Sequence, residues 1–183
     1  MPHFPIHSIE TAPTASKPAL RVLQSAFGFI PNIAGAMSTS PVLIGGLTDL
    51  FGRVHGGSFA EAEIQVLLLT NAVTNASEWA VAFHSALALQ QGIGNDDVDS
   101  IRAGRMPKDD RLAALSRLAR TLIEKRGRLD EAAMQEFIRA GFDESRLLEV
   151  VTVIAASTIT NYTANIANPP LESSFAAHRW QAV

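Results

Sequence analysis

Apolar and polar residues follow one another along this chain with the spacing of helices rather than strands. Apolar side chains recur every three to four positions in segments that are bounded by glycine, proline or a polar capping residue. No segment shows the alternate-residue pattern of a strand between hairpin turns, so we predict an all-α fold. The predicted helices cover residues 17–27, 32–37, 41–55, 59–94, 95–104, 111–126, 130–140 and 144–168.

The longest predicted helix, 59–94, is the one around which the rest is organised. We expect Ser58 to cap it, with Glu61 completing a capping box, and Gly92 and Gly94 to end it. Its first half is apolar on nearly all sides, which is typical of a buried helix. Polar and ionisable groups then gather in its second half: Asn71, Thr74, Asn75, Ser77, Glu78, Trp79 and His84. This change of character makes the second half the first place to look for chemistry.

A second long apolar helix is predicted over 144–168, where Asp143 provides an N-cap and Pro169-Pro170 prevents continuation. It carries a polar row that includes Asn161 and Asn165. Two buried helices with polar stripes should pair them, because a buried amide or imidazole without a partner costs a few kcal/mol. We therefore expect His84 to hydrogen-bond to this row or to a water beside Ser77.

The domain organisation follows from these two helices. Residues 1–16 hold three prolines and little periodicity, which indicates an N-terminal arm. Residues 17–168 form a single helical domain, and residues 169–183 form a C-terminal tail that contains Trp180. At 183 residues the chain is long enough to bury a sizeable core.

Composition narrows the range of partners. Hydrophobic residues make up 47% of the chain and charged residues only 18%, against roughly 25% in an average soluble domain. We therefore expect a homo-oligomer that covers apolar surface, with the arm or the Trp180 tail crossing to a neighbour. The net charge of −3 gives no basic footprint for nucleic acid. Uninterrupted apolar runs fall short of about 18 residues and the N-terminus does not resemble a signal peptide, so we expect no membrane span and a cytoplasmic protein.

The chain contains no cysteine. Disulfides, thiolate nucleophiles, iron–sulfur ligation and cysteine zinc sites are therefore excluded. A histidine zinc site at His84 is disfavoured as well, because the positions four residues away are Ala80 and Ala88. We predict neither a metal nor a cofactor.

Each candidate functional residue also has a structural interpretation. His84 is either a hydrogen-bonded core histidine, an acid/base catalyst or, least favoured, a metal ligand. Glu78 is either a general acid or a surface glutamate, and Trp79 is a core or interface residue rather than a cofactor platform. His55, just before Gly56-Gly57, is better explained as a partner of a helix C-terminus than as a catalyst.

Residues 75–84, NASEWAVAFH, resemble the signature helix of the AhpD-like (carboxymuconolactone decarboxylase) family in its peroxidase-related branch, Cys-x-x-Cys-x-x-x-His. The segments FIPN at 29–32, SPVL at 40–43 and TNYTANIANPPL at 160–171 are similar to the same branch. The likeness spans about residues 27–175. It implies an AhpD-like helical bundle with two long buried helices, and an antioxidant oxidoreductase activity in which a cysteine pair reduces hydroperoxides.

The residues that carry this activity do not match. The first cysteine position of the family falls on Ser77, the second on Ala80, and a proton-relaying glutamate twelve residues upstream falls on Gln65. The family histidine alone is retained, as His84. A serine hydroxyl has no two-electron redox chemistry and forms its alkoxide far less readily than a thiol forms a thiolate, so thiol peroxidase activity is excluded.

Two functions remain, beside a peroxidase by some other route. The first is a pseudoenzyme: an oligomer that binds a partner protein or a small apolar or carboxylate ligand, with Trp79, Asn161 and Asn165 as contacts. The alternative is a thiol-free enzyme of the decarboxylase or lactone type, with His84 as acid/base and Ser77, Glu78 or Asn161 orienting the substrate.

Overall fold

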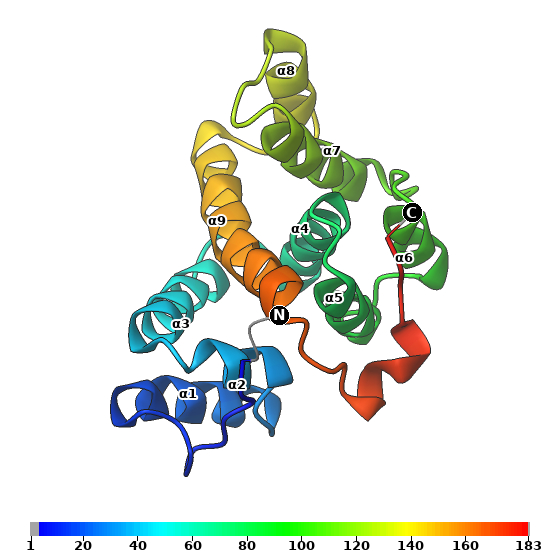
Figure 1. Ribbon diagram of the computed structural model, residues 1–183. Coiled ribbons are helices and arrows are strands. Elements are labelled where there is room, and N and C mark those ends of the chain that lie inside the picture. The colour runs from blue at the N-terminus through cyan, green and yellow to red at the C-terminus, as the bar shows by residue number, and fades with distance from the viewer. Residues whose placement is uncertain (1–3, 183) are drawn as a thin grey trace.

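The computed structural model describes residues 4–182, and its regular structure there is entirely helical, which confirms the all-α prediction (Figure 1). Two short 3₁₀ segments, η1 (Thr14–Ser16) and η2 (Ser173–His178), flank the α-helices. The α-helices are α1 (Lys17–Phe27), α2 (Asn32–Met37), α3 (Pro41–His55), α4 (Glu61–Thr74), α5 (Glu78–Gln90), α6 (Asn95–Arg102), α7 (Asp110–Glu124), α8 (Glu131–Arg139) and α9 (Glu144–Ala167).

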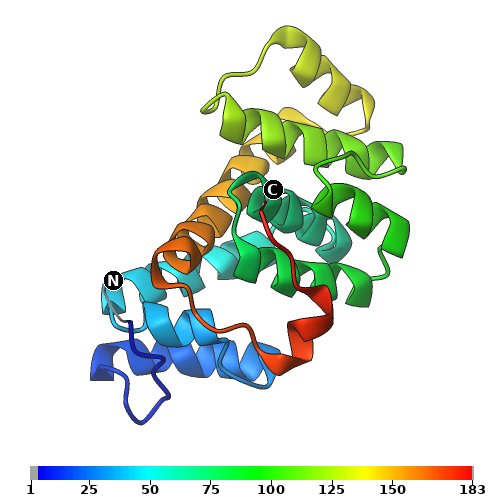
Figure 2. The same ribbon diagram turned by 45° about the vertical axis from the view of Figure 1, so that its right-hand side comes forward.

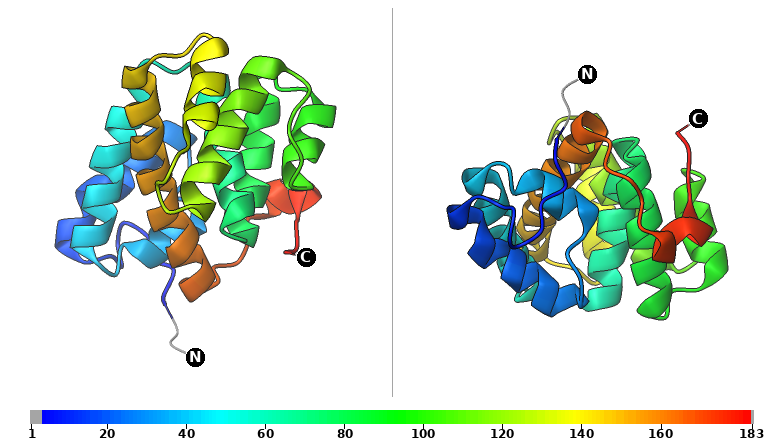
Figure 3. Two further views of the ribbon diagram at one scale, coloured as in Figure 1. Left: turned by 90° about the horizontal axis from the view of Figure 1, so that it is seen from above. Right: turned by 60° about the horizontal axis from the view of Figure 1, so that its bottom comes forward.

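Helices α4 and α5 form the centre of the bundle and lie side by side (Figures 1 and 2). Helix α9 packs across α4 and also contacts α3, α5 and α7. Helices α1 to α3 cover one side of this centre, while α6, α7 and α8 cover the other (Figure 3). Nearly every residue of α4 and α5 between Ile64 and Ala88 is buried, so the two helices are the core of the fold.

The single helix predicted over 59–94 is wrong, because the chain reverses between α4 and α5. The side chains of Thr74 and Asn75 bond the carbonyls of Thr70 and Asn71, each four residues earlier, and so close the end of α4. Ala76 then adopts a left-handed conformation with φ of 51°. Such a turn usually carries glycine or asparagine. Because alanine stands there, the sequence lacked a visible break.

Some predicted helix ends are corrected as well. Ser58 does not cap α4; the N-cap is Ala60, whose backbone N–H donates to the Glu63 carboxylate at 2.9 Å. Helix α5 has its own N-cap, Ser77, which the prediction placed inside a helix. By contrast, Asp143 caps α9 as predicted, with its carboxylate accepting from the Arg146 N–H at 2.8 Å.

The predicted pairing of polar rows is confirmed between α9 and α4. The Asn161 amide donates to Asn71 Oδ1 at 3.3 Å, and Asn71 in turn donates to the Ile154 carbonyl at 3.2 Å. One turn further on, the Asn165 amide donates to the Asn75 carbonyl at 3.0 Å. These bonds place α9 in register against the turn between α4 and α5.

The outer face of α9 is unusually apolar. Leu148, Val151, Tyr162 and Ile166 are each 47–67% exposed, and residues 150–168 include no charged side chain. By length and hydropathy α9 could cross a membrane, which the sequence interpretation had excluded because asparagine and threonine interrupt it. In the fold one face of α9 packs on the bundle and buries apolar side chains such as Val150 and Val153 together with the polar Ser157 and Asn161, while the opposite face is exposed.

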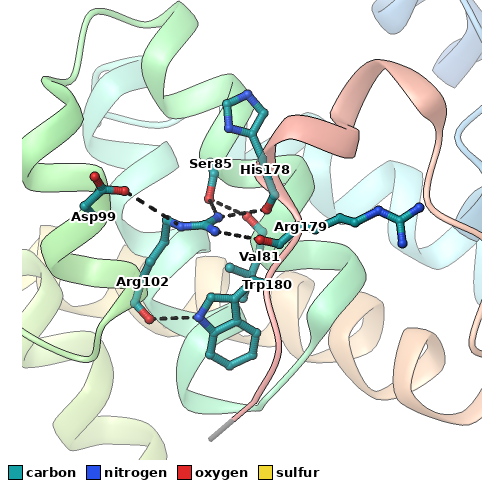
Figure 4. Close-up of polar contacts among 7 residues, drawn as sticks. All are labelled: Val81, Ser85, Asp99, Arg102, His178, Arg179 and Trp180. Atoms are coloured by element: carbon teal, nitrogen blue, oxygen red, sulfur yellow. Dashed lines mark hydrogen bonds and ion pairs between the residues drawn. The ribbon is translucent and has the colours of Figure 1, made fainter.

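The C-terminal tail lies against its own chain (Figure 4). The Arg102 guanidinium on α6 donates to the carbonyls of His178 and Arg179, both at 2.9 Å, and to Ser85 Oγ on α5 at 2.8 Å. The Trp180 indole N–H donates back to the Arg102 carbonyl at 2.9 Å. Figure 2 shows the resulting path of the tail, from the end of α9 past α5 to α6.

The N-terminal arm is also held by its own chain. The His7 N–H bonds the Gly35 carbonyl on α2 at 3.3 Å. A Cβ atom at Gly35 would lie 2.9 Å from the His7 carbonyl oxygen, so glycine permits the close approach of the arm.

Candidate functional site

Two cavities meet at Trp79, whose side chain lines both. The inner one, which we call the inner pocket, has a volume of about 250 Å³ and lies between α1 to α3 on one side and α4 and α5 on the other. Its wall is mostly hydrocarbon. The residues that line it include Phe27, Phe51, Gly52, His55, Gln65, Trp79, Phe83, His84 and Thr160.

The second cavity, the outer groove, is larger and more open, at about 850 Å³. It runs between the start of α5, the end of α9 and the tail, and polar groups line most of it. Glu78, Asn165 and Arg179 are among them, together with Trp180. We regard the inner pocket as the candidate site despite its smaller volume, because it is the one that contains the retained family histidine.

His84 projects from α5 into the inner pocket and is only 5% exposed. Its Nδ1 is 3.0 Å from Oε1 of Gln65, which lies on the neighbouring helix α4. The observed partner is thus on α4 and not on α9 as expected, while the predicted water beside Ser77 stays a prediction. The reversal after Thr74 explains the difference, because it brings two residues of the supposed single helix face to face.

The contact pairs one donor with one acceptor. With the Gln65 amide oxygen facing the ring, Nδ1 of the neutral imidazole donates and Nε2 is left as the acceptor; the opposite orientation of the amide exchanges these roles. Burial, and to a smaller extent the nearby His55, lower the pKa of His84 to about 3. At pH 7 the ring is neutral.

The two family cysteine positions are closed off from both cavities. Ser77 and Ala80 are fully buried, and neither lines the inner pocket or the outer groove. Ser77 Oγ has no hydrogen-bond partner within residues 4–182, even though Ser77 stands at the N-cap of α5. The two positions that the sequence resemblance aligns with the family cysteines therefore carry no thiol and line neither cavity.

The other predicted site residues divide between the two cavities. Glu78 and Asn165 are exposed and line the outer groove. Asn161 is fully buried, lines neither cavity, and serves the contact with α4. Trp79 is largely buried, as expected of a core residue; its N–H donates to Glu172 in the tail at 3.0 Å, and its ring stacks on Phe83.

Sequence reasoning did not find the wall that α1 and α3 contribute. Phe27 packs edge-on against Phe83 across the pocket, and Phe51 stacks on His55 at the end of α3. His55 lies in the last turn of α3, as expected, and its Nδ1 is 2.9 Å from Glu61. No local signal identifies these residues, because helical spacing indicates that a face is buried but not which cavity it borders.

Within residues 4–182, His, Asp and Glu side chains do not gather in groups of three or more that could hold a metal ion. The described part of the inner pocket contains no lysine or arginine.

The sequence matches no protein-family model and no curated protein. Solved structures match across nearly the whole chain. A crystal structure described as an alkylhydroperoxidase AhpD core, an uncharacterized peroxidase-related protein from Ralstonia eutropha JMP134, has a TM-score of 0.83 at 15% identity over 94% of this chain and 93% of its own. An uncharacterized peroxidase-related protein from Silicibacter sp. TM1040 has a TM-score of 0.75 at 16% identity over 94% and 91%.

The debrominase Bmp8 is similar as well. Its apo structure has a TM-score of 0.79 at 16% identity over 96% of this chain and 95% of its own. A cysteine-to-alanine variant in complex with 2,3,4-tribromopyrrole has a TM-score of 0.77 at 17% identity over 97% and 96%. The chain therefore has the AhpD-like all-α fold of the peroxidase-related proteins, as the sequence resemblance predicted, and it has this fold without a cysteine.

Proposed function

We propose that this chain is a pseudoenzyme with the AhpD-like fold, which binds a small, neutral and mainly apolar molecule in the inner pocket and acts as a homo-oligomer. The observation that carries the proposal is the neutral His84–Gln65 pair in an apolar pocket, next to family cysteine positions that hold Ser77 and Ala80.

The thiol peroxidase mechanism has no reactive group here. Hydroperoxide reduction requires a sulfur that accepts oxygen and a second thiol that resolves the product. Ser77 and Ala80 can do neither, and the chain contains no cysteine elsewhere that could replace them. Even the proton relay is altered, because Gln65 offers an amide in place of a carboxylate.

Acid/base catalysis by His84 is the alternative, and the pKa argues against it. A general base works best when its pKa is near the operating pH. With a pKa of about 3, His84 is a very weak base, and about one molecule in ten thousand carries the imidazolium at pH 7. The neighbouring Gln65 cannot stabilise that cation as a carboxylate would, and the exposed Glu78 faces the other cavity.

The lining of the inner pocket favours a neutral ligand over a carboxylate. An anion that enters an apolar site must lose its hydration, which is costly unless a cation pairs with it. Among residues 4–182 no lysine or arginine lines the pocket, and the His55 ring that borders it is already in contact with the Glu61 carboxylate. The complex of the debrominase variant with 2,3,4-tribromopyrrole supports this proposal by analogy, because a protein of similar fold binds a small ring.

The outer face of α9 supports the homo-oligomer. Its exposed apolar side chains are Leu148, Val151, Tyr162 and Ile166, on a helix without charge from residue 150 to 168. A contiguous apolar stripe of this kind is typical of a protein interface. A second copy is the occupant we propose, because pairing α9 with itself would satisfy both stripes at once.

Activity assays test the pseudoenzyme. Protein free of contaminating thiols should not reduce alkyl hydroperoxides with a lipoamide- or thioredoxin-type reductant, and turnover above a blank without protein would contradict the proposal. The double variant Ser77→Cys plus Ala80→Cys should gain partial activity. Adding Gln65→Glu should raise that activity, because it restores a proton acceptor beside His84.

Calorimetry and light scattering test the other two parts. Naphthalene, a neutral bicyclic probe, should bind the wild-type protein, and failure of neutral aromatic probes to bind would overturn the ligand-binding function.

Light scattering at low micromolar concentration should report a multiple of the chain mass. Ile166→Glu should release monomers, whereas Met134→Glu, an exposed apolar residue on α8, should not; a wild-type monomer would rule out the oligomer.

A further inference from the structure

The inner pocket has a size that limits the ligand. Its volume is about 250 Å³, whereas a cavity of about 150 Å³ is enough to bind benzene. Two fused six-membered rings therefore fit, and most drug-sized molecules do not, since their pockets usually start near 300 Å³. This step depends on the proposed function, which places the ligand in this pocket.

The walls indicate the shape of the ligand. Phe27, Phe51, Trp79 and Phe83 all border the pocket. Trp79 and Phe83 stack with ring centroids 4.8 Å apart, while Phe27 meets Phe83 edge-on at 5.5 Å. Aromatic faces and edges in this arrangement favour a flat aromatic guest, which can stack on one ring and contact the edge of another.

The polar groups indicate the chemistry of one edge of that guest. His84 Nδ1 bonds Gln65 Oε1, and neither His84 Nε2 nor the Gln65 amide nitrogen has another partner within residues 4–182. In that range, the side-chain atoms that are both fully enclosed and without a partner are Ser77 Oγ and Asn161 Oδ1. His84 Nε2 and the Gln65 amide nitrogen are not among them, so both atoms are accessible. Both residues line the inner pocket, so these two atoms face it.

The pair therefore presents one acceptor, Nε2 of His84, and one donor, the Gln65 amide N–H, and neither group is charged. Rotating the Gln65 amide by half a turn would exchange the two roles but would still leave one donor and one acceptor. A ligand that leaves either group unpaired loses the corresponding hydrogen bond in a site with little water.

We propose that the inner pocket binds a planar aromatic lactam or a closely related molecule, meaning one or two rings with an N–H and a C=O on the same edge. The ring N–H donates to His84 Nε2, and the carbonyl accepts from the Gln65 amide. Trp79, Phe83 and the α1–α3 wall enclose the rings.

Four bicyclic probes of similar size test this assignment by calorimetry on the full-length protein: 2-quinolone, 1-methyl-2-quinolone, naphthalene and quinoline-2-carboxylate. In 1-methyl-2-quinolone a methyl group replaces the N–H. We expect this methylation to weaken binding to the wild-type protein by about tenfold, the value of one buried hydrogen bond. The carboxylate should bind more weakly than 2-quinolone, because the pocket holds no lysine or arginine.

The variant His84→Phe completes the test, because it keeps a flat ring and removes the acceptor. In this variant the methylation should change the affinity by less than about twofold, because the acceptor that the ring N–H needs has been removed. The wild-type comparison of the two quinolones stands alone if the variant fails to fold.

The outcomes separate this inference from the proposed function. If naphthalene binds but methylation of 2-quinolone has no effect on the wild-type protein, the lactam assignment is wrong and the ligand-binding function stands. Tighter binding of the carboxylate would also overturn the assignment. If none of the four probes binds, both proposals fail.

Discussion

The inner pocket and the outer groove share Trp79, yet they differ in nearly every chemical respect. The outer groove is open and holds Glu78, Asn165 and Arg179, the side chains that would suggest catalysis in a sequence. The inner pocket is smaller and apolar, and its buried ionisable group, His84, is neutral. The comparison teaches that one helix, α5, carries an exposed ionisable residue, Glu78, in the outer groove and a buried one, His84, in a pocket where burial opposes its protonation.

The largest effect is expected from filling the inner pocket. Gly52 on α3 lines it, and a Cβ atom there would meet nothing within 4 Å. Gly52→Leu should therefore abolish naphthalene binding without overpacking the core, and should even stabilise α3 by about 0.5–1 kcal/mol because glycine is a poor helix residue. Calorimetry and chemical denaturation measure the two effects.

Gly46→Leu is the matched control, on the same helix and with equally open surroundings, but outside both cavities. It should gain similar stability and keep full binding. Equal binding by the two variants would show that the ligand does not occupy the inner pocket.

The next largest effect concerns the charge state of His84. Its folded pKa of about 3 lies below the ordinary 6.5, so the unfolded chain binds a proton between these values that the folded chain does not. The contribution of His84 is fully present above pH 6.5 and is lost as the pH falls toward 3. At pH 5 the loss should be about 2 kcal/mol.

Denaturation at pH 7.5 and pH 5.0 measures this loss. His84→Gln stays neutral at both values and can still bond Gln65, so its stability should fall about 2 kcal/mol less than that of the wild-type protein. A similar fall in both proteins would mean that the His84 ring is solvated. The contrast between the apolar inner pocket and the polar outer groove would then not extend to this group.

A smaller effect is expected at Ser77. An N-cap serine usually contributes about 1 kcal/mol, but Ser77 makes no capping hydrogen bond and its buried hydroxyl has no described partner. Ser77→Ala should leave the free energy of unfolding unchanged or raise it by up to about 1 kcal/mol, since it removes an unpaired polar group. Ser40→Ala, at a cap whose hydroxyl accepts from the Leu43 N–H, should cost about 1 kcal/mol by thermal or chemical denaturation. A loss at Ser77 as large as that at Ser40 would reveal a partner for the hydroxyl.

The smallest effect is expected from Glu78→Gln, which removes the carboxylate of the outer groove. Glu78 is exposed and does not line the inner pocket, so naphthalene affinity should stay within about twofold and stability within about 0.5 kcal/mol. A large loss of binding would move the ligand into the outer groove and favour the enzyme hypothesis over the pseudoenzyme.

Local signals determined the helices and most of their ends. Capping aspartates such as Asp143, and Pro41 in the first turn of α3, were readable because a cap or a proline acts on its immediate neighbours. The family resemblance also led directly to the fold. Its motif at residues 75–84 covers the turn after α4 and the first half of α5, and the segment 160–171 covers the end of α9 and the residues that follow it. Caps and motifs depend only on residues that are close together in the chain, so a single sequence is enough to identify them.

The sequence by itself also determined that thiol chemistry is absent, because that conclusion needs only the absence of cysteine from all 183 positions. The tertiary structure alone decided what His84 does. The left-handed Ala76 reverses the chain, α4 and α5 pack side by side, and Gln65 becomes the partner of the imidazole. Pocket walls from α1 and α3 then bury the ring and lower its pKa, an effect of distant segments that no local pattern records because desolvation depends on everything that surrounds a group in space.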